Sequence, residues 1–202
     1  MYIDPMFRYF AIYKPFQVLC QFSASDNKKT LKDYFDVPKD VYPVGRLDYD
    51  SEGLLILTND ASLNQKLLNP IHAHEREYWV QVDGEITEEA LQTLAKGISV
   101  NIDGKIHKTK PCIAEAMPYV PDVPERNPPV RYRKNIPTSW MKLVLTEGKN
   151  RQVRKMTASV NYPTLRLIRH RIAEVNIAHW QPGYMQEFTG PDLFKLLFNS
   201  SK

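Results

Sequence analysis

The sequence predicts an α+β protein in which strands alternate with short helices. The run GLLILT at residues 53–58 is apolar at consecutive positions, which indicates a strand buried on both faces. Residues 77–82, EYWVQV, instead alternate between apolar and polar side chains, as in a strand with one buried face. Between these strands, Leu63 and Leu67 recur at helical spacing. The change of period along the chain therefore favours mixed strands and helices over an all-helical or all-strand fold.

The first half of the chain supplies both strand patterns and helix caps. The predicted elements are a strand at 8–13, a short helix at 30–35, the strand at 53–58, a helix containing Leu63, Leu67 and Leu68 that ends by Pro70, a strand at 77–82 that turns at Asp83-Gly84, and a helix that ends near Gly97. Thr30, Asn59 or Asp60, and Thr87 stand where a side-chain oxygen can cap each helix.

The second half begins with a segment too rich in proline for regular structure. Residues 118–137, PYVPDVPERNPPVRYRKNIP, are expected to form a long ordered or semi-rigid loop. After it the pattern predicts a strand at 139–145, a helix at 151–160, strands at 165–169 and 173–177, and a last helix opened by Gly190-Pro191 with Leu193, Leu196 and Leu197 on its apolar face.

Length and composition favour one globular unit. With 202 residues, of which 43% are hydrophobic, the chain can bury a substantial core, and two lobes around a shared sheet fit better than two independent domains. No apolar stretch approaches the roughly 20 residues that span a bilayer, so a cytoplasmic protein without membrane contact is expected. Cys20 and Cys112 form no CxxC pair, which gives no support to a disulfide framework or a zinc site. A monomer is the working expectation.

Positive charge is concentrated in one part of the chain. Eleven Lys or Arg residues fall between Arg131 and Arg171 against the single acid Glu147, so this segment carries +10 while the remaining residues sum to −6. The whole chain is only mildly basic, at +4. A solvated basic face is one interpretation of this segregation, and a groove that follows the phosphates of a nucleic acid is the favoured one.

The segment PVGRLDYDSEGLLILTND, residues 43–60, carries the sharpest candidate for chemistry. Gly45 allows a tight backbone, Arg46 places a cation beside it, and Asp48 stands just before the buried strand at 53–58. An acid next to a rigid strand can be held in a fixed position. A carboxylate that merely ends a turn is the alternative interpretation.

A second candidate is the segment EGKNRQVRKMTASV, residues 147–160. Asn150 is expected to cap a helix that presents Arg151, Arg154 and Lys155 on one face and packs through the other. Such a helix can bind phosphates, and one of its arginines can pair with a buried carboxylate. An ordinary amphipathic helix explains the same pattern.

Tyr78 is the third candidate. On the predicted strand it shares a face with Val80 and Val82, and pattern alone favours a core tyrosine. A tyrosine at the end of a strand can also stack on an extruded nucleobase while its hydroxyl meets a polar partner.

Several blocks together resemble the RsuA-type ribosomal pseudouridine synthases. GRLDYDSEGLLILTND is similar to the signature of that family, and KPFQVLCQFS, EYWVQV, EGKNRQVRKM and LRLIRHRI match its other blocks in the expected order. The resemblance spans nearly the whole chain. It implies a mixed, mostly antiparallel central sheet with flanking helices, and two lobes around an RNA-binding cleft. It also implies a single catalytic domain over residues 1–202 without the small S4 RNA-binding domain of many relatives.

The resemblance also assigns roles to individual residues. Asp48 matches the catalytic aspartate, Tyr78 the tyrosine that stacks on the target base, and Arg154 the basic residue that pairs with the aspartate. Arg46 matches the arginine of the aspartate loop that contacts RNA. The basic residues Lys149, Arg151, Lys155 and Arg169 are expected to contact RNA as well. Ser51 stands where the family often has Thr and keeps the hydroxyl.

The implied reaction is the isomerisation of a uridine in 23S ribosomal RNA to pseudouridine, with no cofactor. Asp48 is expected to be ionised, but the residues do not separate attack on C1′, attack on C6 and a glycal route. The alternatives are a transfer RNA substrate or a non-catalytic RNA-binding factor of ribosome assembly. His72 and His74 lack a third ligand nearby in the sequence, so no metal site is expected. The modified nucleotide is not identified by the sequence.

Overall fold

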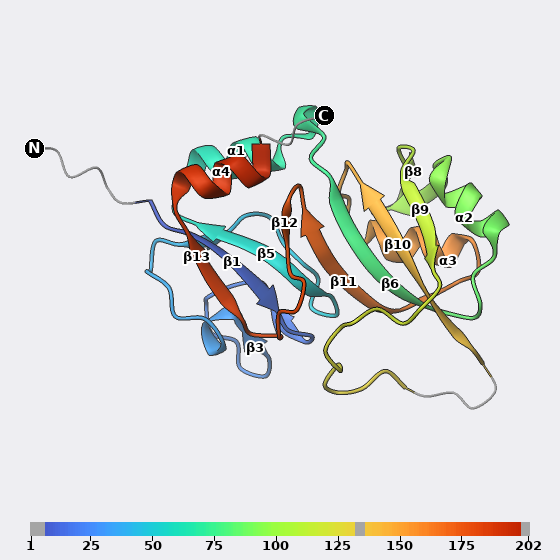
Figure 1. Ribbon diagram of the computed structural model, residues 1–202, viewed down its shortest axis with the longest axis horizontal. Helices are drawn as coiled ribbons and strands as arrows, with labels where there is room; N and C mark the ends of the chain where they lie inside the picture. Colours follow the sequence, from blue (N-terminus) through green and yellow to red (C-terminus); the bar gives the residue numbers. More distant parts are fainter. Residues whose placement is uncertain (1–6, 132–135, 199–202) are drawn as a thin grey trace, which may run out of the picture. The chain divides into compact units, whose positions relative to one another are not determined.

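The computed structural model describes residues 7–131 and 136–198 (Figure 1). The chain divides into two compact units. The first comprises residues 1–74 and 171–202, and the second comprises residues 75–170. None of the helices in the described ranges is long and apolar enough to cross a membrane.

The first unit is built on the strands β1 (Tyr9–Lys14) and β5 (Glu52–Thr58). These strands are antiparallel, and β1 pairs on its other side with β13 (Met185–Phe188). All residues of β1 and β5 are buried, as the unbroken apolar run of β5 predicted. The short strand β4 (Tyr42–Pro43) pairs with β5 and brings the chain to the loop that contains Asp48.

Different segments pack against the two faces of this sheet. On one face Phe10, Ile12, Leu55 and Leu57 form a core cluster with Leu31 of the 3-10 helix η1 (Leu31–Asp33). On the other face Tyr9 meets the ring of Phe194 at 6.0 Å between centroids; this residue belongs to helix α4 (Gly190–Phe198). Helix α1 (Ala61–Leu68) begins after Asp60, whose carboxylate accepts hydrogen bonds from the backbone of Ser62 and Leu63.

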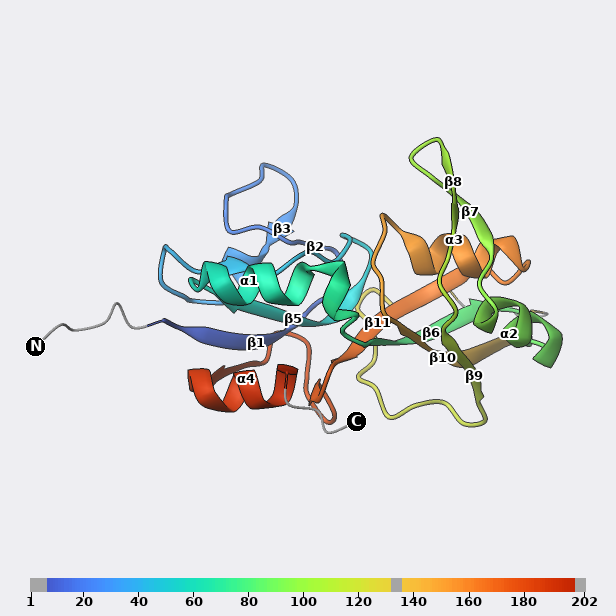
Figure 2. The same cartoon turned by 90° about the horizontal axis from the view of Figure 1, so that it is seen from above.

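Smaller elements complete the first unit. They are β2 (Val18–Leu19) and β3 (Lys29–Thr30), which pair in parallel, the 3-10 helix η2 (Pro70–His72), and β12 (Val175–Asn176). The chain between β2 and β3 stands out from the sheet as a loop (Figure 2).

The second unit contains a sheet in the order β11 (Thr164–Ile172), β6 (Arg76–Asp83), β10 (Thr138–Leu145) and β9 (Ile113–Met117). β10 is antiparallel to both β6 and β9. The helices α2 (Glu88–Ala95) and α3 (Gln152–Ser159) join the sheet in one hydrophobic core, to which Leu94, Met156 and Met141 contribute fully buried side chains. The hairpin of β7 (Ser99–Ile102) and β8 (Lys105–Lys108) leads on to β9.

Two arginines hold the proline-rich loop, which is described up to residue 131 and from residue 136. Arg126 donates to the carbonyl oxygen of Leu165 at 3.2 Å, and Arg166 donates to the carbonyl oxygen of Pro124 at 2.8 Å. The described part of 118–137 contains no helix or strand, as its prolines predicted. These hydrogen bonds tie the described part of the loop to β11 although it contains no regular structure.

The predicted α+β class with a mixed, mostly antiparallel sheet is confirmed. The strand predicted at 173–177 is shorter, because Ala173 has a φ of +48° and makes a turn, so only Val175–Asn176 pair. The predicted helix at 30–35 is a single 3-10 turn, Leu31–Asp33. The short strands β2, β3, β4, β7, β8, β9 and β13 were not predicted. Most of them are too short to show a period.

Candidate active site

The loop that carries Asp48 is fixed by backbone hydrogen bonds on both sides of the aspartate. Before it, Val44 N–H donates to the carbonyl oxygen of Ile56 in β5 at 2.8 Å. After it, Ser51 N–H donates to the carbonyl oxygen of Asp48 at 3.1 Å, and Gln17 N–H donates to that of Tyr49 at 2.9 Å. The loop is therefore tied to the strand that it precedes and to the segment after β1. This supports the inference that the aspartate is held in a fixed position.

Gly45 lets the chain enter this loop. Its φ is +71°, a left-handed backbone conformation that residues other than glycine rarely adopt. A Cβ at this position would also lie 3.0 Å from Cδ2 of Leu68 in α1. The glycine noted in the sequence is thus required by both backbone conformation and close packing.

Exposure differs along the loop. Arg46 is exposed, Leu47 is buried, and Asp48 is half-buried. Ser51 and Glu52 behind it are buried, each about 1% exposed. The aspartate thus lies between solvent and core, where a reactant can reach a carboxylate whose surroundings are partly desolvated.

Lys14 is a buried cation that the sequence reasoning missed. Its side chain is fully buried, and Nζ donates to the carbonyl oxygens of Pro15 at 2.9 Å and Val18 at 2.8 Å. Burial lowers the pKa of Lys14 to about 8, although electrostatic interactions with Cys20, Glu52, Asp50 and Asp48 act to raise it. The signal was present in the KP pair at the end of a buried strand. It was not used because lysines at strand ends are ordinarily solvated.

Tyr78 lies in the core of the second unit. It is 9% exposed and belongs to the same cluster as Val80, Val82 and Leu167. The predicted alternation of β6 is therefore confirmed, and the side chain is at least a core tyrosine. Its stacking on a nucleobase remains a prediction.

Helix α3 carries two of the basic candidates and follows directly after a third. It begins at Gln152, and Arg151 precedes it in a left-handed conformation with a φ of +53°. Val153 and Met156 are buried, as predicted for the packing face, while Arg154 and Lys155 are half-buried and Arg151 is exposed. The amphipathic character of the helix is confirmed.

The predicted cap of this helix is wrong. Asn150 does not cap α3; its Nδ2 donates to Oδ1 of Asp103, in the β7–β8 turn, at 2.8 Å. The side-chain hydrogen bond near the beginning of α3 comes instead from Gln152, whose Oε1 accepts from Lys149 N–H at 3.0 Å. The asparagine binds the hairpin because the turn brings an acceptor within reach.

Glu147 holds the segment before α3 in place. Its carboxylate accepts hydrogen bonds from Lys110 N–H at 2.9 Å and from Gln152 Nε2 at 2.7 Å. The same carboxylate lies 3.1 Å from His107 Nε2. Burial acts to raise the pKa of Glu147, but these hydrogen bonds outweigh it and the pKa is lowered. The acid was counted in the sequence only as a charge. Its role depends on β8 and the residues after it, which lie far away in the chain.

Arg169 is the most buried of the predicted RNA-contacting residues, at 5% exposure. Its charge reaches Arg76: burial lowers the pKa of Arg76, and Arg169 lowers it further while Tyr78 acts in the opposite direction. Arg76, Tyr78 and Arg169 thus interact electrostatically in the second unit. Arg76 was not among the sequence candidates.

Several charges of the basic segment have structural partners. Arg166 binds the carbonyl of Pro124, Arg171 binds that of Ala173, and Lys142 pairs with Glu115 at 2.8 Å. Arg133 and Lys134 lie outside the described residues. Lys149 and Arg151 are exposed. The net charge of +10 in residues 131–171 is therefore larger than the number of cations in this segment that can contact a ligand.

The candidates fall into two groups. Asp48 and Arg46 belong to the first unit. The second unit holds the remaining ones, namely Tyr78, Lys149, Arg151, Arg154, Lys155 and Arg169. The joint action of Asp48 with Tyr78 and Arg154 is therefore still a prediction. Among the residues that the structure describes, no three His, Cys, Asp or Glu side chains are grouped to hold a metal ion.

Comparison with known proteins identifies relatives over most of the chain. A family model described as RNA pseudouridylate synthase matches residues 8–159. A protein of Vibrio parahaemolyticus serotype O3:K6 named ribosomal large subunit pseudouridine synthase E is 48% identical over 174 residues, which cover 86% of this chain and 71% of the relative. A protein of the same name from Xanthomonas campestris pv. campestris is 46% identical and covers 84% of this chain and 89% of its own.

The fold also has solved counterparts. A crystal structure of a pseudouridylate synthase is similar with a TM-score of 0.76 and 25% identity, covering 97% of this chain and 76% of the other. The similarity in fold thus extends beyond the residues matched by the family model.

Proposed function

The chain belongs to the RNA pseudouridylate synthase family, and we propose that it isomerises a specific uridine of 23S ribosomal RNA to pseudouridine. The observation that carries this proposal is its 48% identity, over 86% of the chain, with a relative named as a synthase of the large ribosomal subunit. Family membership makes the chain an isomerase. The choice of ribosomal RNA over other RNA rests on the names of its relatives.

The reaction exchanges one glycosidic bond for another. The bond from uracil N1 to ribose C1′ breaks, the detached base turns, and a bond from C5 to C1′ forms. The C5 proton is lost and N1 gains a proton, so substrate and product have the same composition and no cofactor is consumed. The enzyme must supply a carboxylate, a surface that holds the detached base, and a pocket that retains it.

We assign the carboxylate to Asp48. Attack on C1′, attack on C6 and removal of a ribose proton in a glycal route all require an ionised acid at a fixed position. Asp48 is half-buried in a loop tied by hydrogen bonds to β5 and to the segment after β1, which supports this assignment. Tyr78 would stack on the extruded base, and Arg154 would pair with the carboxylate.

Extruding the uridine from its stack costs a few kcal/mol, which contacts to the RNA must offset. Arg46, Lys149 and Arg151 are exposed and are suited to contact phosphates. Lys155, four residues after Arg151, is half-buried. Arg169 is buried, so it can reach only a nucleotide that enters the protein interior. We place the enzyme in the cytoplasm and expect it to act as a monomer.

The proposal is tested by mapping pseudouridine in total RNA from cells with and without the gene. Carbodiimide adducts at pseudouridine stop reverse transcriptase, so one missing stop identifies the substrate. The expected result is the loss of a stop in 23S RNA that returns with the wild-type gene. A loss in transfer RNA alone would refute the ribosomal substrate, and an unchanged map would refute the activity.

A further inference from the structure

The end of the β2–β3 loop, the strand β3 and the 3-10 helix η1 together carry a group of cations outside the proposed site. Lys28, Lys29 and Lys32 fall within five positions of the chain and are all exposed. Residues 24–30, 32 and 33 line a hollow of about 590 Å³. The loop is ordered at its base, where Val18 pairs with Lys29 and Leu31 N–H donates to the carbonyl oxygen of Gln21 at 2.9 Å. The segment of residues 24–33, which carries these lysines, will be called the lysine loop.

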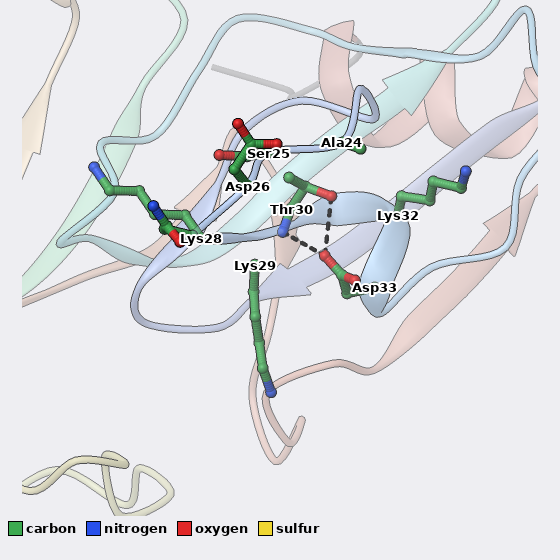
Figure 3. A pocket seen from close by; sticks show the side chains of 9 residues that line it. Ala24, Ser25, Asp26, Lys28, Lys29, Thr30, Lys32 and Asp33 are labelled. Carbon is green, nitrogen blue, oxygen red and sulfur yellow. Dashed lines mark hydrogen bonds between the residues drawn. The ribbon is translucent and has the colours of Figure 1, made fainter.

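One of the two carboxylates in the lysine loop accepts hydrogen bonds from within the same segment. Asp33 accepts hydrogen bonds from Thr30 N–H at 2.7 Å and from Thr30 Oγ1 at 3.0 Å (Figure 3). The backbone hydrogen bond, with that of the hydroxyl, lowers the pKa of Asp33. With Asp26 as the other carboxylate, this segment carries three lysines against two aspartates. Lys29 Nζ donates to Oη of Tyr34 at 3.3 Å, and all three lysine side chains are exposed, so an anion in solution can reach them.

The lysine loop is joined to the loop that carries the proposed catalytic residue. The ammonium of Lys28 lies over the ring of Tyr49, 4.8 Å from its centroid, and Tyr49 directly follows Asp48. Both loops belong to the first unit. A nucleic acid bound to these lysines would therefore run past the residue next to Asp48.

The directions of the side chains indicate what kind of anion they fit. In Figure 3, Lys28, Lys29 and Lys32 point away from one another around the loop and do not converge on one point. A single phosphate is held by converging donors, whereas successive phosphates of a strand require cations spread along its path. The arrangement therefore fits an extended polyanion.

We propose that the lysine loop binds the phosphate backbone of the RNA strand that carries the target uridine. This inference rests on the proposed function and adds to it a contact that none of the sequence candidates supplies. The loop would hold the strand beside Asp48 from within the first unit. Base identity would be read elsewhere, because phosphate contacts carry no sequence information.

The test compares three triple variants with the wild-type protein in filter binding to a large-subunit ribosomal RNA transcript at several salt concentrations. K28A/K29A/K32A should lower the slope of log affinity against log salt by about 2, from about 0.7 for each of three phosphates. K28R/K29R/K32R should keep the wild-type slope. The matched control K39A/K66A/K195A removes three exposed lysines of the same unit and should also keep it.

Three outcomes would overturn the inference. An unchanged slope in K28A/K29A/K32A, or an equal drop in the control, would exclude a specific strand contact. Competition by inorganic phosphate at matched ionic strength would point to a single-anion site instead. Because binding is measured without turnover, a wild-type protein that binds RNA but forms no pseudouridine would refute the proposed function and leave the lysine loop to be judged by its slope.

Discussion

At the scale of single residues, the main distinction is between two acids of one loop. Asp48 and Asp50 are both half-buried and lie in the same hydrogen-bonded loop. Only Asp48 stands at the position that the family resemblance assigns to the catalytic carboxylate. A carboxylate that takes part in bond exchange must lose almost all activity when its charge is removed.

Asp48→Asn should therefore lower turnover by at least about a thousandfold while leaving the fold intact. The amide nearly preserves the shape of the side chain but cannot act as nucleophile or base. The measurement is single-turnover pseudouridine formation, with a melting curve to verify folding. Asp50→Asn makes the same chemical change two positions away and should keep most of the activity. Turnover of Asp48→Asn within tenfold of wild type would contradict the assignment.

Lys14 shows how a buried charge connects structure to pH. Its pKa is lowered by burial from 10.5 to about 8, so between these values the unfolded chain holds a proton that the folded protein has lost. Stability must therefore rise with pH between about 8 and 10.5 from this residue, by up to about 3 kcal/mol. Below pH 8 the residue is charged in both states and contributes no slope.

Lys14→Met should remove that rise. We expect urea unfolding of the wild type to show a free energy that increases from pH 8 to pH 10 relative to the variant. Lys39→Met changes an exposed lysine of the same unit and should follow the wild type. Parallel pH profiles for wild type and Lys14→Met would show that the buried amine is not perturbed.

At the scale of elements, helix α3 is held from outside its own sequence. Its beginning lacks a side-chain cap hydrogen bond at Arg151, and Glu147 instead binds the chain after β8 to Gln152 in the helix. The segment before the helix also binds the β7–β8 turn through Asn150 and Asp103. The arginines of this region thus depend on the hairpin for their position.

Glu147→Gln should destabilise the protein by about 2 kcal/mol at pH 7, because an amide nitrogen would face donors in place of an acceptor. The pKa of Glu147 is lowered, so its contribution is complete above about 4.5 and is lost as pH falls through the folded value. The difference between wild type and variant in urea unfolding should accordingly shrink at acidic pH.

Glu115→Gln is the matched control for this prediction. Glu115 forms an ion pair with Lys142, but its side chain is 57% exposed, and such pairs contribute about 0.5 kcal/mol or less. A cost for Glu147→Gln no larger than that of the control would mean that the three hydrogen bonds do not stabilise the segment before α3.

At the scale of the whole molecule, the distribution of charge matters more than its sum. The net charge is only +4, and the basic segment from 131 to 171 includes arginines that bind the protein's own backbone. Only cations that face solvent release counterions when RNA binds. Exposed and buried members of the same segment should therefore respond differently to substitution.

Lys149→Ala and Arg166→Ala should separate these two classes. The first removes an exposed cation and should lower the salt slope of RNA binding by about 0.7 without changing the melting temperature. The second removes the donor to Pro124 and should lower stability by about 1–3 kcal/mol while the slope is unchanged. Equal effects of both substitutions on the slope would show that Arg166 also reaches phosphate.

The sequence by itself determined the elements whose pattern is local. The strands β1, β5, β6 and β10 and the helices α1, α2 and α3 could be predicted because period and cap residues lie within the element. Of the two predicted caps of α1, Asn59 and Asp60, the structure selects Asp60; a cap can be predicted because it is separated from its partners by only two or three residues. The family resemblance, which rests on blocks along the chain, is confirmed by the comparison with known proteins.

The tertiary structure alone decided which polar side chains form hydrogen bonds with distant parts of the chain. Asn150 binds Asp103 across 47 positions, Glu147 binds Lys110 across 37, and Arg166 binds Pro124 across 42. Lys14 is fully buried at the end of β1, where it pairs with Gly53 of β5. A pattern in the chain specifies a residue's face, but its partner is chosen by folding, since only the folded chain brings distant donors and acceptors together.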